Sequence, residues 1–146
     1  MCNRHTFEFD ADKAYEDQLV SVLDASPEHP LTAPEAPQQP GIYVLFRKGL
    51  LVYVGQAVKL RGRLSDHCKK IENRQGISAS EVTCRFLTIR TMWEVARAED
   101  ALIRRYKPEW NGIPGFSMHV PGIGRPGKPG YVNEWDKRFP PRKKQR

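Results

Sequence analysis

The stretch GIYVLFRKGLLVYVG, residues 41–55, determines the fold that this sequence predicts. Two runs rich in β-branched and aromatic residues, 42–46 and 50–54, flank Arg47-Lys48-Gly49, which predicts a β-hairpin with a three-residue loop. In that register Phe46 faces Leu50 and Tyr43 faces Tyr53, so the two tyrosines share one face. Both runs are almost continuously apolar, which predicts that both faces of the sheet are covered.

Helical spacing follows the hairpin. Over residues 58–72, Leu60, Leu64, His67 and Ile71 fall on one stripe, and Arg63 precedes His67 by four residues. Residues 81–89 predict a further strand. Residues 91–106 predict a second helix, with Thr91 and Glu94 as a capping box. Its stripe consists of four residues: Val95, Glu99, Leu102 and Tyr106.

The flanking regions are less regular. Residues 12–24 predict a helix with Ala14, Leu19, Val22 and Leu23 on its apolar side. Residues 26–40 hold five of the twelve prolines, which indicates a linker or an extended arm. Glycine and proline dominate residues 112–130, and residues 142–146 form a basic tail. The predicted fold is α+β, with an antiparallel sheet of about three strands flanked by helices. We expect one compact domain with an N-terminal helix and proline-rich arm (1–40), a core (41–112) and a Gly/Pro-rich DNA-binding extension (113–146).

Charge points to a polyanionic partner. Lys plus Arg is 24 against 17 for Asp plus Glu, a net charge of +7 with a pI near 9.5. Nucleic acid is the first candidate and an anionic membrane surface the second. No apolar run approaches the length of about 20 residues that spans a bilayer, and residues 1–10 lack a signal-peptide pattern. We therefore expect a cytoplasmic protein without a membrane partner.

The three cysteines, Cys2, Cys68 and Cys84, are odd in number and form no CxxC pair, which favours free thiols in a reducing compartment. A zinc site built from His67, Cys68, Cys84 and His119 is conceivable, but it lacks the paired, closely spaced ligands of structural zinc sites.

Two residues interrupt apolar stripes, Glu99 and His67. A buried carboxylate is costly unless it is paired or binds a cation. Glu99 is therefore either a metal ligand or the partner of Arg97, Arg104 or Arg105. His67 is either a site residue or a hydrogen-bonded core histidine. The tyrosine pair is otherwise ordinary aromatic packing.

Taken in order, these positions resemble the GIY-YIG nuclease superfamily over about residues 40–112. The resemblance rests on Gly41-Ile42-Tyr43, on Tyr53-Val54-Gly55 with Val54 in place of the usual Ile, and on an Arg, a Glu and an Asn that follow. It implies six catalytic residues, one of them (Glu99) the metal ligand: Tyr43, Tyr53, Arg63, His67, Glu99 and Asn111. Arg61 is a second candidate for the arginine; the i, i+4 spacing to His67 favours Arg63. One Mg²⁺ per site is expected, with Mn²⁺ as a substitute.

The resemblance also suggests roles. Tyr43 would activate the attacking water, with its pKa lowered by a cation and Arg63, and His67 would relay the proton or hold Tyr43. Tyr53 would contact phosphate or fill the site, and Asn111 would orient Glu99 or the helix end.

The C-terminal third, with Gly112-Ile113-Pro114-Gly115-Phe116 and Tyr131-Val132-Asn133-Glu134-Trp135-Asp136, is similar to the tail of GIY-YIG type II restriction enzymes that cut GC-rich palindromes. It implies a homodimer on double-stranded DNA. Five cations are candidate DNA contacts: Lys59, Arg61, Arg104, Arg125 and Lys128. The alternatives are a repair or mobile-element nuclease, which usually carries a separate DNA-binding domain not seen here, and a catalytically dead DNA-binding protein.

Overall fold

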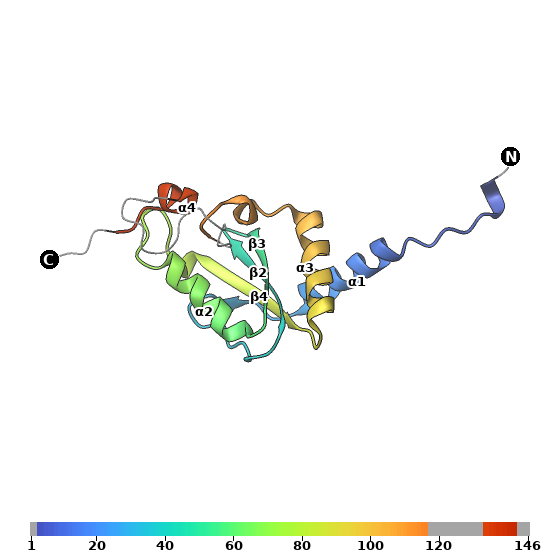
Figure 1. Ribbon diagram of the computed structural model, residues 1–146, viewed down its shortest axis with the longest axis horizontal. Coiled ribbons are helices and arrows are strands. Elements are labelled where there is room, and N and C mark those ends of the chain that lie inside the picture. Colours follow the sequence, from blue (N-terminus) through green and yellow to red (C-terminus); the bar gives the residue numbers. More distant parts are fainter. Residues whose placement is uncertain (1–2, 117–132, 143–146) are drawn as a thin grey trace.

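A computed structural model describes residues 3–116 and 133–142 (Figure 1). The helices are α1 (Ala11–Ala25), α2 (Leu60–Ile71), α3 (Met92–Tyr106) and α4 (Glu134–Arg138), with short 3₁₀ turns η1 (Asn3–His5), η2 (Ala79–Glu81) and η3 (Glu109–Gly112). The strands are β1 (His29–Pro30), β2 (Gly41–Arg47), β3 (Leu50–Ala57) and β4 (Val82–Thr88). Among the described helices, none is long and apolar enough to cross a membrane.

The strands form one antiparallel sheet in the order β1-β4-β2-β3. The predicted α+β class is confirmed, and the sheet has one strand more than expected. That strand, β1, comes from the proline-rich arm and pairs only with Thr83 and Cys84. An edge position suits β1. Pro30 has no N–H to donate, so β1 could not complete the backbone hydrogen bonds to neighbouring strands on both of its sides.

Each face of the sheet carries its own hydrophobic cluster, as the continuous apolar strands predict. Ile42, Val44 and Val54 face α1 and α3. Tyr43 and Leu45 face the opposite way, toward α2 and the C-terminal segment. In Figure 1 the sheet lies between α2 and α3. The helical stripe of α2 is also confirmed, since all four of its predicted core residues are buried.

The hairpin register differs from the prediction. The turn between β2 and β3 has two residues, Lys48 and Gly49, both with positive φ (52° and 77°), as tight hairpin turns of the I′ kind require. An irregularity after Leu45 then shifts the pairing, so that Tyr43 faces Gly55 and Leu45 faces Tyr53. The expected Tyr43–Tyr53 pair was therefore wrong as a register, although the two rings still share a face.

Two helix predictions need correction. In α1 the buried residues are Val20 and Leu23, and Val22 is 51% exposed. At the start of α3 the Thr91 hydroxyl bonds to the Glu94 carboxylate at 2.8 Å and caps no backbone N–H, so the predicted capping box does not form.

The proline-rich arm is held against the start of α2. Lys59 provides no side-chain cap there. Instead the first helical N–H groups donate to arm atoms: Leu60 N to Gln39 O at 3.0 Å, Arg61 N to Pro37 O at 3.2 Å and Gly62 N to Gln38 Oε1 at 3.0 Å. The arm thereby satisfies helix donors that would otherwise lack partners.

The C-terminal segment returns to the core after residue 132. Trp135 N donates to Pro114 O at 3.0 Å, so residues 114 and 135 are neighbours. The rings of Trp110, Phe116, Trp135 and Phe139 are buried against one another. Residues 113–116 and 133–142 thus share the hydrophobic cluster of α2 and the Tyr43 face of the sheet.

Candidate active site

The centre of the site is a hydrogen bond between β2 and α2. Tyr43 Oη lies 2.5 Å from His67 Nε2, and both side chains are fully buried. His67 Nδ1 has no hydrogen-bond partner among the described residues. His67 is therefore a core histidine and a partner of the first tyrosine at once, which merges the two readings that the sequence left open.

Aromatic rings surround this pair. Tyr53 lies 5.9 Å from Tyr43 and 5.0 Å from His67, measured between ring centroids. Phe116 stacks on His67 at 4.8 Å and meets Tyr53 edge-on at 5.0 Å. Such contacts fix ring orientation because the rings have few alternative rotamers in a dense core.

Steric contacts explain why the second motif has a glycine at position 55. A Cβ at Gly55 would lie 2.3 Å from Tyr43 Oη and 2.8 Å from Tyr53 Cε1. The phenol of Tyr43 thus lies directly over the backbone of Gly55, its cross-strand neighbour. Gly41 is equally constrained, since a Cβ there would lie 2.1 Å from Leu87 O on β4.

Arg63 brings positive charge to the phenols. It is half-buried on α2 and interacts with both Tyr43 and Tyr53. It also lines an open groove with Gln56, Ala57, Val58, Lys59, Gly62 and Asp66. Arg61 differs, because its Nε donates to Ala36 O at 2.8 Å and so ties the side chain to the proline-rich arm. The geometry therefore favours Arg63 over Arg61 as the arginine of the site.

Burial dominates the titration of the central pair. It raises the pKa of Tyr43 well above its usual range; the Tyr53 phenol adds to this and Arg63 opposes it. The expected lowering by Arg63 is thus present but outweighed. Burial, with the charges of Arg63 and Lys70, lowers the pKa of His67 to about 2. Both groups are neutral at physiological pH in this structure.

Glu99 is a half-buried carboxylate without a hydrogen bond or ion pair in the described part of the chain. The three arginines that were its possible partners are engaged elsewhere: Arg97 with Asp12, Arg104 with Asp100, and Arg105 with Glu16 and Asp17. Burial raises the pKa of Glu99, as does Asp100, while Arg63 lowers it. Because the charge of Arg63 acts on the pKa of Glu99, the Glu99 carboxylate lies within electrostatic range of the site.

A divalent ion fits this carboxylate. Mg²⁺ keeps several waters and needs only one or two carboxylates, so a single unpaired Glu suffices. A zinc site is not supported: the described residues contain no cluster of three or more His, Cys, Asp or Glu, and Cys68 and Cys84 are buried free thiols. His119, the fourth zinc ligand considered, lies outside the described residues.

Asn111 differs from its expected role. Its Oδ1 accepts from Val54 N at 2.9 Å, and its Nδ2 donates to Val54 O at 2.7 Å. Since β3 is an edge strand, the amide pairs with backbone groups that lack a neighbouring strand. Asn111 thus fixes β3 between Tyr53 and Gly55; in the described residues its hydrogen bonds do not go to Glu99.

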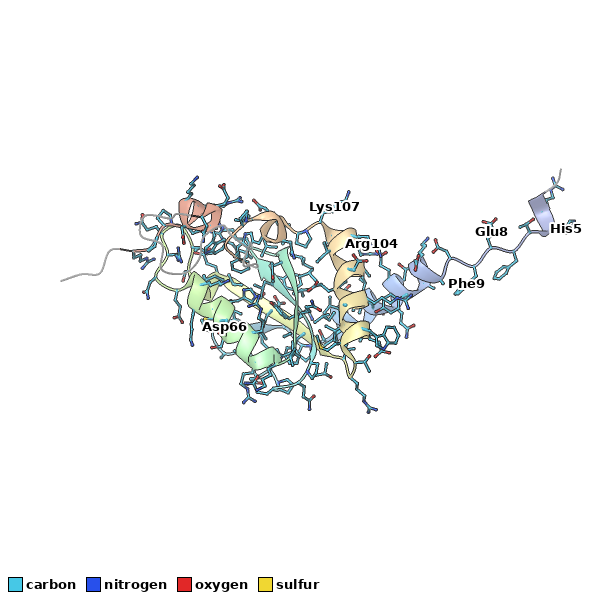
Figure 2. All side chains as sticks on the ribbon, in the orientation of Figure 1. His5, Glu8, Phe9, Asp66, Arg104 and Lys107 are labelled. Atoms are coloured by element: carbon cyan, nitrogen blue, oxygen red, sulfur yellow. The ribbon has the colours of Figure 1, made fainter. Side chains whose placement is uncertain are left out.

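The other candidate DNA contacts are scattered. Lys59 is exposed on the groove of Arg63. Arg104 is 72% exposed and paired with Asp100 at 2.6 Å; Figure 2 shows it on α3. Arg125 and Lys128 lie outside the described residues.

Sequence reasoning missed Phe116 and Lys70 as parts of the site. Lys70 Nζ donates to Phe116 O at 2.5 Å, which holds Phe116 against His67. Lys70 lies three residues after His67, next to it on one helix face, a usable signal. No periodic pattern leads to Phe116, because it lies in an irregular Gly/Pro-rich segment.

This chain is similar to a known protein family. A model of the family described as the Eco29kI GIY-YIG domain matches residues 46–145, well over half of the chain. The chain belongs to this family. The resemblance seen in the sequence is thereby confirmed, and a GIY-YIG domain indicates a metal-dependent nuclease with DNA as substrate. The tyrosine motif at residues 41–43 lies just ahead of the matched stretch.

Curated relatives include UvrABC system protein C. The protein of Aquifex aeolicus (strain VF5) is 33% identical over 90 residues, which are 59% of this chain and 16% of the relative. That of Brucella abortus (strain 2308) is 34% identical over 79 residues, 51% of this chain and 13% of the relative. This GIY-YIG domain thus spans only a small part of the length of these relatives.

Similar solved structures include the GIY-YIG N-terminal endonuclease domain of UvrC from Thermotoga maritima. Its magnesium-bound form is 25% identical with a TM-score of 0.42, over 55% of this chain and 91% of that one. A point mutant bound to its catalytic divalent cation is 27% identical with a TM-score of 0.44, over 55% and 90%.

Proposed function

We propose that this GIY-YIG domain is a type II restriction endonuclease. It would hydrolyse phosphodiester bonds of double-stranded DNA at a GC-rich palindrome, as a homodimer, with one Mg²⁺ per site or Mn²⁺ in its place. The observation that carries the chemistry is the neutral Tyr43–His67 pair beside Arg63, together with the half-buried, unpaired carboxylate of Glu99. These groups supply a proton acceptor, an anion-binding cation and a metal ligand.

Two residues would help to neutralise the negative charge of the scissile phosphate. Glu99 would hold the metal ion, which when bound supplies positive charge to the scissile phosphate and the leaving oxygen. Arg63 would bind the non-bridging oxygens through its planar fork of donors. Tyr53 would contact the phosphate after Arg63 has moved there.

Proton transfer falls to Tyr43. His67, with a pKa of about 2, is a poor net proton acceptor, so its role is to hold the phenol by hydrogen bond. Tyr43 would first release its phenol proton to solvent, and the resulting phenolate would then take the proton of the attacking water. Its raised pKa makes the phenolate scarce in the DNA-free protein and strong as a base once formed.

Arg63 also controls access to Tyr43. Tyr43 is fully buried, and Arg63 interacts with both phenols. Movement of the guanidinium onto a phosphate would uncover Tyr43 Oη only when DNA is present. The proton acceptor would then face water at the moment it is needed.

Two observations bear on restriction against repair. The match to the Eco29kI domain extends to residue 145, and the C-terminal segment that it includes folds against the site through Phe116. This supports a restriction enzyme. Curated relatives include UvrABC system protein C, which supports a repair nuclease as the second candidate.

DNA contacts would come from outside the central pair. Lys59 on the groove, Arg61 and Arg104 are proposed to bind phosphates. Arg125 and Lys128 are proposed to read guanine edges in the major groove, where the planar fork of Arg or the ammonium group of Lys can donate to two acceptors.

The test is incubation of the purified protein with supercoiled plasmid and Mg²⁺. A restriction enzyme gives discrete fragments, and sequencing their ends gives the site and the stagger. A smear would support the repair-type or nonspecific reading. Intact but retarded plasmid would support a DNA-binding protein and contradict the nuclease proposal.

A further inference from the structure

The N-terminal segment, residues 3–10, extends away from the rest of the molecule. Figure 1 shows it leaving the start of α1, and Figure 2 shows His5, Glu8 and Phe9 far from the core. Phe7 is 85% exposed and Phe9 is 69% exposed. In an extended chain, residues two apart point to the same side, so the segment carries two aromatic rings on one side.

Within one chain, these two exposed rings contribute to no packed core among the described residues. Phe7 and Phe9 stand outside both hydrophobic clusters and outside the candidate active site. Each large ring that is moved from water into an apolar contact buries about 150 Å² or more. A pair of them on a projecting segment is typical of a segment that docks on another surface.

A matching groove lies between α1 and the end of β4. Its apolar lining consists of Tyr15, Leu19, Val22, Leu87 and Ile89. Val22, half-exposed, is the residue that the sequence predicted to be buried. β1 pairs with β4 only at Thr83 and Cys84, so in the described sheet the side of β4 away from β2 has no strand beside it from Phe86 to Thr88. The groove therefore offers apolar side chains next to an open strand edge, which suits an extended peptide.

The segment of the same chain points the wrong way to fill this groove. Asp10 caps α1 by accepting from Lys13 N at 2.9 Å, which fixes the direction in which the chain enters the helix. The groove begins one turn into α1, at Tyr15, behind that entry. The occupant that fits is thus the segment of another molecule.

We infer that residues 3–10 of one chain bind the groove between α1 and β4 of a second copy, and that the exchange is reciprocal. A two-fold axis makes both contacts equivalent and closes the assembly. Four rings and the groove surface that they cover amount to about 1,200 Å² in total, the lower end of a stable interface. This contact would hold together the dimer that the proposed two-fold restriction enzyme requires. The inference rests on the proposed function only for the biological role of the dimer.

The experiment measures the oligomeric state of the full chain without DNA by sedimentation equilibrium. The parent is expected to be a dimer at low micromolar concentration. Phe7→Ser with Phe9→Ser, and separately Val22→Glu, are expected to raise the dimer dissociation constant at least about 10-fold. Leu50→Ser is the control, because Leu50 is 70% exposed but lies at the far end of the hairpin.

A disulfide test identifies the contact. In a Cys2→Ser background, a chain with Phe7→Cys is mixed with a chain with Val22→Cys; the native Cys68 and Cys84 are buried. A cross-linked pair of chains is expected. A monomeric parent, a dimer that survives both sets of substitutions, or cross-linking only within a chain that carries both new cysteines would overturn the inference. Plasmid cleavage by the same samples keeps the two proposals apart, because a monomer that still cuts DNA contradicts the exchange and the homodimer but leaves the proposed nuclease activity standing.

Discussion

At the scale of single residues, the burial of His67 links the site to stability. The unfolded chain binds a proton at this residue below its ordinary pKa of about 6.5, whereas the folded chain does not until the pKa of about 2. Between these values the unfolded state holds more protons, so stability is complete above about pH 6.5 and falls as the pH is lowered.

The parent should therefore lose about 2 kcal/mol of unfolding free energy from this group between about pH 6.5 and pH 5. His67→Asn, which cannot titrate, should lack that part of the slope. Denaturant unfolding of both proteins across this range measures the difference. Parallel slopes would show that His67 is not buried in its neutral form.

The two arginines of α2 make a matched pair. Arg63→Ala removes the cation beside the phenols and should slow single-turnover cleavage on the order of 100-fold or more. Arg61→Ala removes a hydrogen bond to Ala36 O and should cost about 1 kcal/mol of stability with a small effect on rate. A larger rate loss in Arg61→Ala would mean that the wrong arginine has been assigned.

At the scale of elements, β3 carries a sterically constrained position beside the site. Gly55→Ala would place a methyl group 2.3 Å from Tyr43 Oη, so Tyr43 must leave His67 or β3 must shift. Cleavage should fall at least about 100-fold, since misplaced catalytic groups are costly. Gly112→Ala is the control, because nothing lies within 4 Å of its added Cβ. Equal activity of the two variants in a plasmid assay would refute the close contact.

The observed helices and strands also show which features of the fold the sequence predicts. Hydrophobic periodicity predicted α2, α3, β2, β3 and β4, and family resemblance brought Tyr43, Arg63 and Glu99 into one hypothesis. The hairpin register was missed because a positive φ at Lys48 and the irregularity after Leu45 leave no mark in an apolar pattern. The role of Asn111 was missed because it depends on β3 being an edge strand, which only the sheet order reveals.

At the scale of the whole molecule, the C-terminal segment stabilises the site. Trp135 is buried between Phe116 and Phe139, and its indole Nε1 donates to Lys70 O at 3.4 Å. Trp135→Ala should cost about 3–5 kcal/mol, the usual loss for a large buried ring. Trp93→Ala should be nearly neutral, because Trp93 is 66% exposed. Thermal unfolding compares the two; similar losses would contradict a shared core.

The account as a whole depends on one carboxylate. Glu99→Gln keeps the shape of the side chain and removes the charge that would hold the metal ion, whereas Asp100→Asn changes the neighbouring carboxylate that already pairs with Arg104. The decisive measurement is plasmid cleavage across a Mg²⁺ series, with DNA affinity measured in parallel. Glu99→Gln should bind DNA like the parent and cut at least about 100-fold more slowly, while Asp100→Asn cuts normally. Cleavage by Glu99→Gln within a few-fold of the parent would contradict the single-metal nuclease site.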